Sequence, residues 1–271
     1  MNDAGVILGR IGDSARAALD TFEVFEELES TNTYLLRQAR PADGRFRAVL
    51  AKHQTAGRGR DDKIWHSPPG SGLCLSLAYT FAKVPRSLPS LTLAIGVAVA
   101  AALERLGASG LALKWPNDLV AHDGKLGGIL TEIHSNAENA RTVVVGIGLN
   151  VDLPNSMRYA APASWSNRIS DLTACMDQLP TRAELAAAVI GSIIDAARRF
   201  ERGGFGEFRE AWQEYDWLKG KRVSVRQVQH RISGMAVGID EDGALLVKTE
   251  AGTERVISGS IEVPAYGVAC A

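Results

Sequence analysis

The sequence predicts an α+β protein in which a mixed sheet with helices precedes a small β-barrel. Apolar runs of strand length, separated by turn residues, recur between residues 46 and 150. A long helix rich in Ala, Leu and Val is predicted from Leu88 to Leu106. From Gly220 onward the chain changes to short strands of alternating polarity. We therefore expect two domains, residues 1–219 and residues 220–271.

The composition is that of an ordinary globular protein, with 46% hydrophobic and 23% charged residues among 271. The formal net charge of −1 argues against a general basic surface for nucleic acid, so any anion site must be local. Cys74, Cys175 and Cys270 are scattered without a zinc-binding spacing, and this pattern indicates reduced thiols in the cytoplasm. The first residues do not have the charged start and apolar segment of a secretion signal.

Residues 1–20 form a short extension in which we expect one short helix, around Ala15 to Leu19. A helix-turn-helix domain takes roughly 50 residues or more, so this extension is too short to contain one. Thr21–Phe25 alternates weakly in polarity and is predicted to be a strand. Ser30-Thr31-Asn32 precedes an apolar run and is typical of a helix N-cap. These residues either only cap the helix or also present hydroxyl and N–H groups to a small polar ligand.

The most informative stretch follows the buried strand predicted over Phe46–Ala51. Gly57-Arg58-Gly59-Arg60 combines two glycines, which let a ligand come close, with two guanidinium groups suited to carboxylate or phosphate. A solvated basic turn is the simpler interpretation of so short a motif. A flexible, doubly cationic loop at the end of a strand instead predicts a clamp for an anionic small molecule.

A second polar group follows the predicted strand Leu73–Tyr79 and the long helix. Charged residues near the end of this helix, among them Glu104, indicate a core helix rather than a membrane span. Leu111–Lys114 is predicted to be a strand that ends in Trp115-Pro116-Asn117-Asp118. Asn117 and Asp118 are common turn formers. With Lys114 they also place a carboxylate, an amide and a cation at one strand end.

Two glycine-bearing strands come next. The turn His122-Asp123-Gly124 leads into a strand that starts with Lys125 and contains Gly127-Gly128. Thr142–Asn150 is a buried strand with two more glycines, and it ends in an amide side chain. Glycine weakens a strand, so a ligand or another backbone approaching closely would explain these positions. Lys125 itself is either a simple surface residue or part of the site.

The remainder of the first domain combines a loop with two helices. Residues 152–170 form a long loop in which Trp165 either anchors the loop or stacks on a ligand ring. A capping box at Thr181 opens a helix that continues to about Arg202. A further amphipathic helix is predicted over Phe205–Trp217. Beyond it, four or five short strands in about 50 residues predict the small barrel.

Taken together, five motifs resemble those of biotin protein ligase, also called biotin–[acetyl-CoA-carboxylase] ligase, in order and in spacing. The matching stretches are Ser30-Thr31-Asn32, Gln54 with Gly57-Arg58-Gly59-Arg60 and Trp65, Lys114-Trp115-Pro116-Asn117-Asp118, Lys125-Leu126-Gly127-Gly128-Ile129-Leu130, and Gly146-Ile147-Gly148-Leu149-Asn150. The resemblance implies a catalytic domain like that of class II aminoacyl-tRNA synthetases, followed by an SH3-like barrel. It also implies that biotin and MgATP give biotinyl-5′-AMP, which then biotinylates a lysine of a carboxylase's biotin carboxyl carrier domain.

The resemblance also implies roles for individual residues, which we treat as expectations. The expected catalytic residues are Arg58, Arg60, Asp118 and Lys125. The expected biotin-binding residues are Ser30, Thr31, Asn32, Gln54, Gly57, Arg58, Gly59, Arg60, Lys125, Gly127, Gly128 and Gly148. The expected ATP-binding residues are Arg58, Arg60, Trp65, Lys114, Asn117, Lys125, Asn150 and Trp165.

The chain departs from the family pattern in two places. Bifunctional members carry an N-terminal DNA-binding domain, whereas too few residues precede Ser30 here, so we expect a monofunctional ligase without operator binding. Asp61-Asp62 stands where a more basic run is common. The sequence identifies no Mg²⁺ ligands, and it leaves open the carrier protein and whether the ligase is a homodimer. We expect no membrane association.

Three alternatives remain at this point. A lipoate ligase would share the fold, but its pocket would be longer and less polar. A biotin sensor without catalytic activity could dispense with Lys114 or Lys125, and both are present here. A fragment of an aminoacyl-tRNA synthetase would need a surface that binds tRNA, which a net charge of −1 does not suggest.

Overall fold

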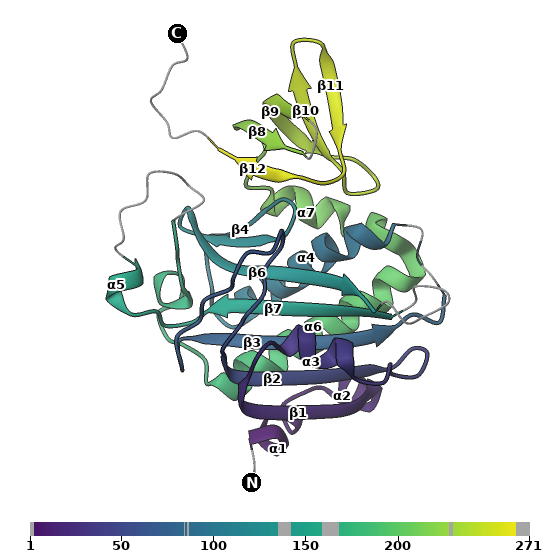
Figure 1. The fold of residues 1–271 in the computed structure, drawn as a ribbon, viewed down its shortest axis with the longest axis vertical. Helices are drawn as coiled ribbons and strands as arrows, with labels where there is room; N and C mark the ends of the chain where they lie inside the picture. Colours follow the sequence, from purple (N-terminus) through teal and green to yellow (C-terminus); the bar gives the residue numbers. More distant parts are fainter. Residues whose placement is uncertain are drawn as a thin grey trace.

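A seven-stranded mixed sheet dominates the computed structural model, which describes residues 3–83, 85, 87–134, 142–158, 168–227 and 230–263 (Figure 1). Its strands are β1 (Leu19–Leu28), β2 (Phe46–Gln54), β3 (Gly72–Thr80), β4 (Leu111–Lys114), β5 (Asp118–Ala121), β6 (Gly124–Ile133) and β7 (Thr142–Asn150). Their order across the sheet is β1-β2-β3-β7-β6-β5-β4. The β1–β2 pair is parallel and every other pair is antiparallel. The mixed sheet predicted from the apolar runs is confirmed.

Helices cover both faces of this sheet, so its central strands are apolar on both sides. Every residue of β3 is buried. On one face lies α3 (Thr31–Arg37), whose Leu35 packs with Val49 and Val144. On the other lie α4 (Leu91–Arg105) and α6 (Arg182–Gly203), which pack their buried faces into the main core. The helix α4 is apolar and, with the preceding turn from Leu88, long enough to cross a membrane, but 67% of that window is buried inside the protein.

Helix ends follow their local sequence signals closely. Ser30 caps α3 by accepting a hydrogen bond from the backbone N–H of Thr33. The predicted capping box is confirmed at α6, where Thr181 and Glu184 satisfy each other's backbone N–H groups. Gly204 follows α6 with a φ of 66°, a conformation that glycine adopts without strain. These caps fix the start of α3 and both ends of α6.

Two expectations about helices were wrong. The N-terminal extension contains α1 (Asp3–Leu8) and α2 (Asp13–Ala18) rather than one short helix, because both bury apolar residues against α6. The helix expected over Phe205–Trp217 is also shorter than predicted, because α7 covers only Arg209–Tyr215. Its expected continuation is diverted because the backbone N–H of Trp217 bonds to the carbonyl of Leu113 in β4. A short helix, α5 (Asn155–Arg158), lies in the expected loop 152–170.

A second, five-stranded antiparallel sheet follows. Its strands are β8 (Arg222–Arg226), β9 (Arg231–Ile239), β10 (Leu245–Thr249), β11 (Gly252–Val256) and β12 (Ser260–Glu262). Their order is β11-β10-β9-β8-β12. Five strands agree with the four or five short strands expected after Gly220. In Figure 1 this sheet stands above the β4 edge of the main sheet.

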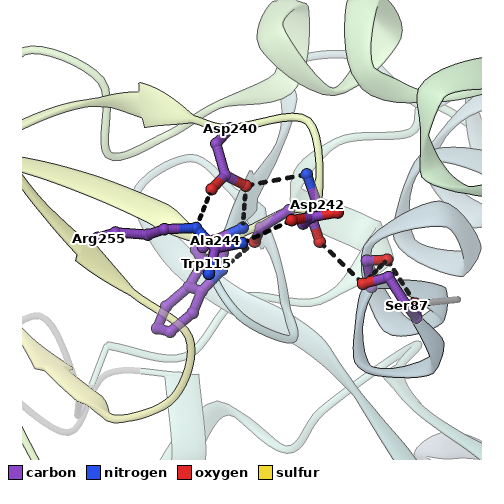
Figure 2. A network of polar contacts seen from close by, with 8 residues as sticks. Ser87, Trp115, Asp240, Asp242, Ala244 and Arg255 are labelled. Carbon is purple, nitrogen blue, oxygen red and sulfur yellow. Dashed lines mark hydrogen bonds and ion pairs between the residues drawn. The ribbon is translucent and has the colours of Figure 1, made fainter.

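The turn between β9 and β10 fastens the second sheet to the first (Figure 2). Trp115 Nε1 donates to the carbonyl of Gly243 over 3.0 Å, and Ser87 Oγ donates to the carbonyl of Asp242 over 3.2 Å. Asp240 stiffens the turn by accepting hydrogen bonds from two of its backbone N–H groups and from Arg255. The second sheet is therefore held against the end of β4, where the expected site residues lie.

Candidate active site

A cavity of about 230 Å³ opens where the main sheet, the loop Gly57–Trp65 and β12 meet. Most of the expected site residues line it. They are Ser30, Thr31, Asn32, Gln54, Arg58, Gly59, Arg60, Trp65, Lys114, Asn117, Asp118, Lys125, Gly128 and Gly148. Further lining residues that were not among the expected site residues are Asp61, Lys63, Ile64, Pro116, Ile129, Leu130, Gly146, Ile147, Gly259, Ser260 and Ile261. Residues from both ends of the chain thus converge on one cavity.

One end of the cavity is neutral and rich in hydrogen bonds. Thr31 donates to Gln54 Oε1 from both its backbone N–H and its hydroxyl, over 2.8 and 3.0 Å. Ser76 Oγ lies 2.7 Å from Thr31 Oγ1 and 2.6 Å from Asn32 Oδ1, and its single proton can serve only one of them. Ser30, Thr31, Asn32 and Ser76 are all buried. This end presents fixed polar atoms in a water-poor setting.

The side chain of Asn32 is held by Ser76, Leu130 and Glu132. Its amide nitrogen donates to Glu132 Oε2 over 2.9 Å and to the Leu130 carbonyl over 3.2 Å. A Cβ on Gly146 would lie 2.2 Å from Asn32 Oδ1, so only glycine fits there. The glycine of β7 therefore admits the Asn32 side chain. The sequence predicted a close approach at these glycines, and the approaching group at this position belongs to the protein.

The other glycines differ from one another. Trp65 lies against Gly148, where a Cβ would be 2.5 Å from its ring. Gly57 and Gly127 do not line the cavity, because an added Cβ would meet the Trp65 carbonyl and the Gly148 carbonyl respectively. Gly128 faces the Lys125 side chain at an ordinary 3.6 Å. Only part of the space expected from the paired glycines is therefore open.

The loop Gly57–Trp65 carries the two expected clamp arginines, and they have different environments. Arg58 forms two hydrogen bonds with the Glu132 carboxylate, 2.7 and 3.3 Å long. Arg60 Nη1 lies 3.5 Å from Asn117 Oδ1. Because Glu132 balances the charge of Arg58, Arg60 carries more of the loop's uncompensated charge. Glu132 was not expected in the site. Alternate residues of a strand share one face, so its position two residues after Leu130 and four after Gly128 was the available sign.

The opposite end of the cavity is ionic. Lys125 Nζ lies 2.6 Å from Asp118 Oδ1, and Lys114 Nζ lies 3.7 Å from Asp118 Oδ2. Lys114 is 6% exposed. Burial lowers its pKa to about 8, although the adjacent Asp118 carboxylate acts to raise it. Five cationic and two acidic side chains line the cavity, so positive charge is concentrated here in a chain whose net charge is −1.

Besides Gly57 and Gly127, two further expected site residues are absent from the cavity lining, for different reasons. Asn150 donates to the backbone carbonyls of Lys125 and Ser170, over 3.2 and 3.0 Å. It thereby fixes the start of β6, from which Lys125 projects. Trp165 lies outside the described residues. Among the residues that the structure describes, no group of three or more His, Cys, Asp or Glu side chains could hold a metal ion.

This geometry suits one kind of ligand. A neutral polar ring can be recognised at the buried end, while an anionic tail reaches the lysines and Arg60. Several cations at one place can also hold a second anion close to the first. The cavity can therefore bring together a carboxylate and a phosphate, which repel each other in water.

Comparison with known proteins agrees with this arrangement. Residues 24–150 match the Biotin/lipoate A/B protein ligase family, and residues 219–263 match the Biotin protein ligase C terminal domain. The second match confirms the SH3-like domain. The bifunctional ligase/repressor BirA of Escherichia coli (strain K12) is 31% identical over 264 residues, covering 96% of this chain and 78% of that protein. The biotin–[acetyl-CoA-carboxylase] ligase of Mycobacterium tuberculosis is 30% identical over 246 residues, covering 88% and 87% respectively.

Solved structures extend the likeness to three dimensions. The biotin protein ligase of Aquifex aeolicus, in complex with biotin and ATP, superposes with a TM-score of 0.75 at 28% identity. The match covers 89% of this chain and 97% of the other. Both the catalytic fold and the C-terminal domain are thus shared with enzymes of one kind. The chain belongs to the biotin protein ligase family.

Proposed function

We propose that this protein biotinylates a lysine of a carrier protein, using ATP and a biotinyl-5′-AMP intermediate. One observation carries the proposal: a single cavity joins a buried neutral end to a strongly cationic end. Biotin has the matching form, a neutral ureido ring with a carboxylate tail. The relatives named as biotin ligases and the biotin ligase C-terminal domain support biotin over lipoate.

In the first half-reaction, a biotin carboxylate oxygen attacks the α-phosphorus of ATP and pyrophosphate leaves. Lys125 lines the cavity beside Asp118 and is our candidate to contact both the carboxylate and the α-phosphate. Arg60 and Lys63 add positive charge from the loop, and Lys114 adds it from β4. These groups stabilise the charge that builds up on phosphorus and hold the two anions in line. Ser30–Asn32 and Gln54 hold the ring.

In the second half-reaction, a neutral lysine amine of the carrier attacks the acyl carbon of the mixed anhydride. A carbon–nitrogen bond forms, AMP leaves with the bonding electrons, and the amine loses a proton. Asp118 is the candidate to orient that amine or accept the proton, since it is the carboxylate beside Lys125. Before substrates bind, Asp118 is paired with Lys125 and Lys114.

The proposal also covers the metal ion, the two domains, the acceptor protein and the cellular compartment. Mg²⁺ would enter with ATP and would compensate the charge of its phosphates. Residues 1–219 form the catalytic domain and residues 220–271 the C-terminal domain. The acceptor is a biotin carboxyl carrier domain, and the reaction takes place in the cytoplasm, where ATP is available. A single catalytic role without operator binding remains our prediction.

Biotin-dependent exchange of labelled pyrophosphate into ATP tests the proposal directly, because it reports the first half-reaction alone. We expect exchange with biotin and little exchange with lipoate under the same conditions. Exchange with lipoate and not with biotin would identify a lipoate ligase. Tight biotin binding without any exchange would identify a sensor.

A further inference from the structure

We infer that Asp61 is a positioning residue that fastens the loop Gly57–Trp65 to the C-terminal domain through Ser260. The inference rests on the proposed function, because the loop carries Arg60 and Lys63 into the site. It also explains an acidic residue beside a cavity for two anions. Neither residue was assigned a role from the sequence.

The contact joins parts of the chain that are 199 residues apart. Ser260 Oγ donates to Asp61 Oδ2 over 3.0 Å. Asp61 and Ser260 both line the cavity, as do Gly259 and Ile261 on either side of the serine. Ile261 contributes again through its carbonyl, which lies 3.5 Å from Lys114 Nζ. The first residues of β12 therefore form a wall of the cavity.

Ser260 is a fixed point because its strand and its sheet are both held. Ser260 pairs with Arg226 of β8 in an antiparallel ladder. Gly259, with a φ of 152°, lets β12 lie so close to β8 that a Cβ would be 2.7 Å from Val225 Cγ1. On another side, the β9–β10 turn is fastened to Trp115, as Figure 2 shows. The serine hydroxyl thus holds a set position relative to β4 and β5.

The second half of the loop Gly57–Trp65 needs a fixed contact of this kind. Arg58 ties its first part to Glu132, while the stretch from Arg60 to Ile64 is exposed or half-exposed. Asp61 and Asp62 both adopt left-handed backbone angles, with φ of 54° and 56°, which Asp tolerates better than most residues. This turn directs Asp61 toward Ser260. The hydrogen bond also orients the carboxylate toward a donor, which limits its repulsion of an incoming phosphate.

Loss of the contact has a specific expected consequence. The loop would retain its cations but hold them less precisely over the cavity. Binding of ATP and retention of biotinyl-AMP would weaken, because the loop carries Arg60 and Lys63 into the cavity. Transfer from the intermediate to the carrier would change less, since Asp118 and Lys125 stand on the sheet.

The test is a double-mutant cycle of Asp61→Ala and Ser260→Ala in the full chain, with Asp62→Ala as the matched control. The control removes an adjacent acidic residue at the same backbone angle, and the described part of the chain shows no hydrogen bond or ion pair for Asp62. Three quantities are measured: the KM for ATP in pyrophosphate exchange, the release rate of biotinyl-AMP, and the rate of tryptic cleavage in the loop. Thermal melting checks that each variant is folded.

We expect Asp61→Ala, Ser260→Ala and the double variant each to raise the KM and the release rate about fivefold, the loss typical of one hydrogen bond. The effects are not additive, because each change removes the same contact. Asp61→Asn keeps an acceptor and restores near wild-type values, and Asp62→Ala stays within about twofold.

Two results would overturn the inference: additive effects, or equal effects of Asp61→Ala and Asp62→Ala. A wild-type protein without biotin-dependent exchange would instead refute the proposed function. The two failures are therefore distinguishable in one set of assays.

Discussion

The two ends of the cavity are stabilised by different physics. At the neutral end, Thr31, Gln54, Ser76 and Asn32 bond to one another inside the core before any ligand arrives. At the ionic end, Lys114 and Lys125 are paired with Asp118, and in the proposed mechanism they exchange this partner for a substrate anion. The difference teaches that, in the proposed mechanism, selecting the acid and activating it are separate tasks. Selection depends on polar groups already held in place, and activation depends on positive charges that can change partners.

The largest expected effect tests the ionic end alone. Lys125→Met leaves the neutral end intact, so biotin binding should weaken by only a few-fold. Pyrophosphate exchange should fall by about 10³, at the upper end of what removing one preorganised donor costs in other enzymes. Isothermal titration with biotin and the exchange assay measure the two separately. Equal losses of biotin binding and of pyrophosphate exchange would show that the two ends do not have separate roles in binding and catalysis.

A smaller effect is expected from the neutral end. Gly146→Ala places a Cβ where Asn32 Oδ1 now lies, at 2.2 Å, and displaces that side chain. We expect biotin affinity to fall by about 50-fold, or ~2.3 kcal/mol, with ATP affinity unchanged. The matched control is Gly191→Ala on α6, where an added Cβ meets nothing within 4 Å. Unchanged biotin affinity in Gly146→Ala would contradict the preset geometry.

Glu132 links the two regions, since it bonds both Asn32 and Arg58. Glu132→Gln weakens both contacts because the acceptor loses its charge, and it leaves Arg58 uncompensated. We expect a roughly tenfold weaker biotin affinity and faster tryptic cleavage of the loop, consistent with hydrogen bonds to charged groups worth about 1.5–3 kcal/mol. The control is Glu29→Gln, which breaks the exposed pair with Arg37 and should change neither measurement. Faster cleavage in both variants would argue against an anchoring role.

The smallest effect concerns pH. Burial places the pKa of Lys114 at about 8, so this residue loses its charge as the pH rises from 7 to 9. We expect exchange to fall about fivefold over this range, with biotin affinity constant. The stability of the fold changes in the opposite direction. Between pH 8 and the ordinary lysine pKa of 10.5, Lys114 is protonated in the unfolded chain and neutral in the folded one. Its contribution to the free energy of unfolding therefore rises with pH. If a Lys114→Met protein shows neither trend, both trends are assigned to Lys114. If it shows both, they are due to other groups.

Much of this arrangement was predictable because its signals are local. The caps at Ser30 and Thr181, the glycine-rich strands and the charged strand ends all follow from short patterns. Ser76 and Glu132 were missed because their roles arise only when β3, β6 and the loop come together. A serine in the middle of the buried strand β3 was the available sign for the first. The contact of Ser260 with Asp61 spans most of the chain, so no local pattern could reveal it.

The position of Trp65 also determines how occupation of the cavity can be observed. Its ring lies against Gly148, and Lys125 Nζ is 5.7 Å from the ring centre. A flat ligand ring that enters beside Gly148 must displace this indole and change its polarity and charge environment. The protein therefore contains its own fluorescent reporter, and stopped-flow emission with Trp65→Phe as the blank would resolve the rate of ligand entry without any label.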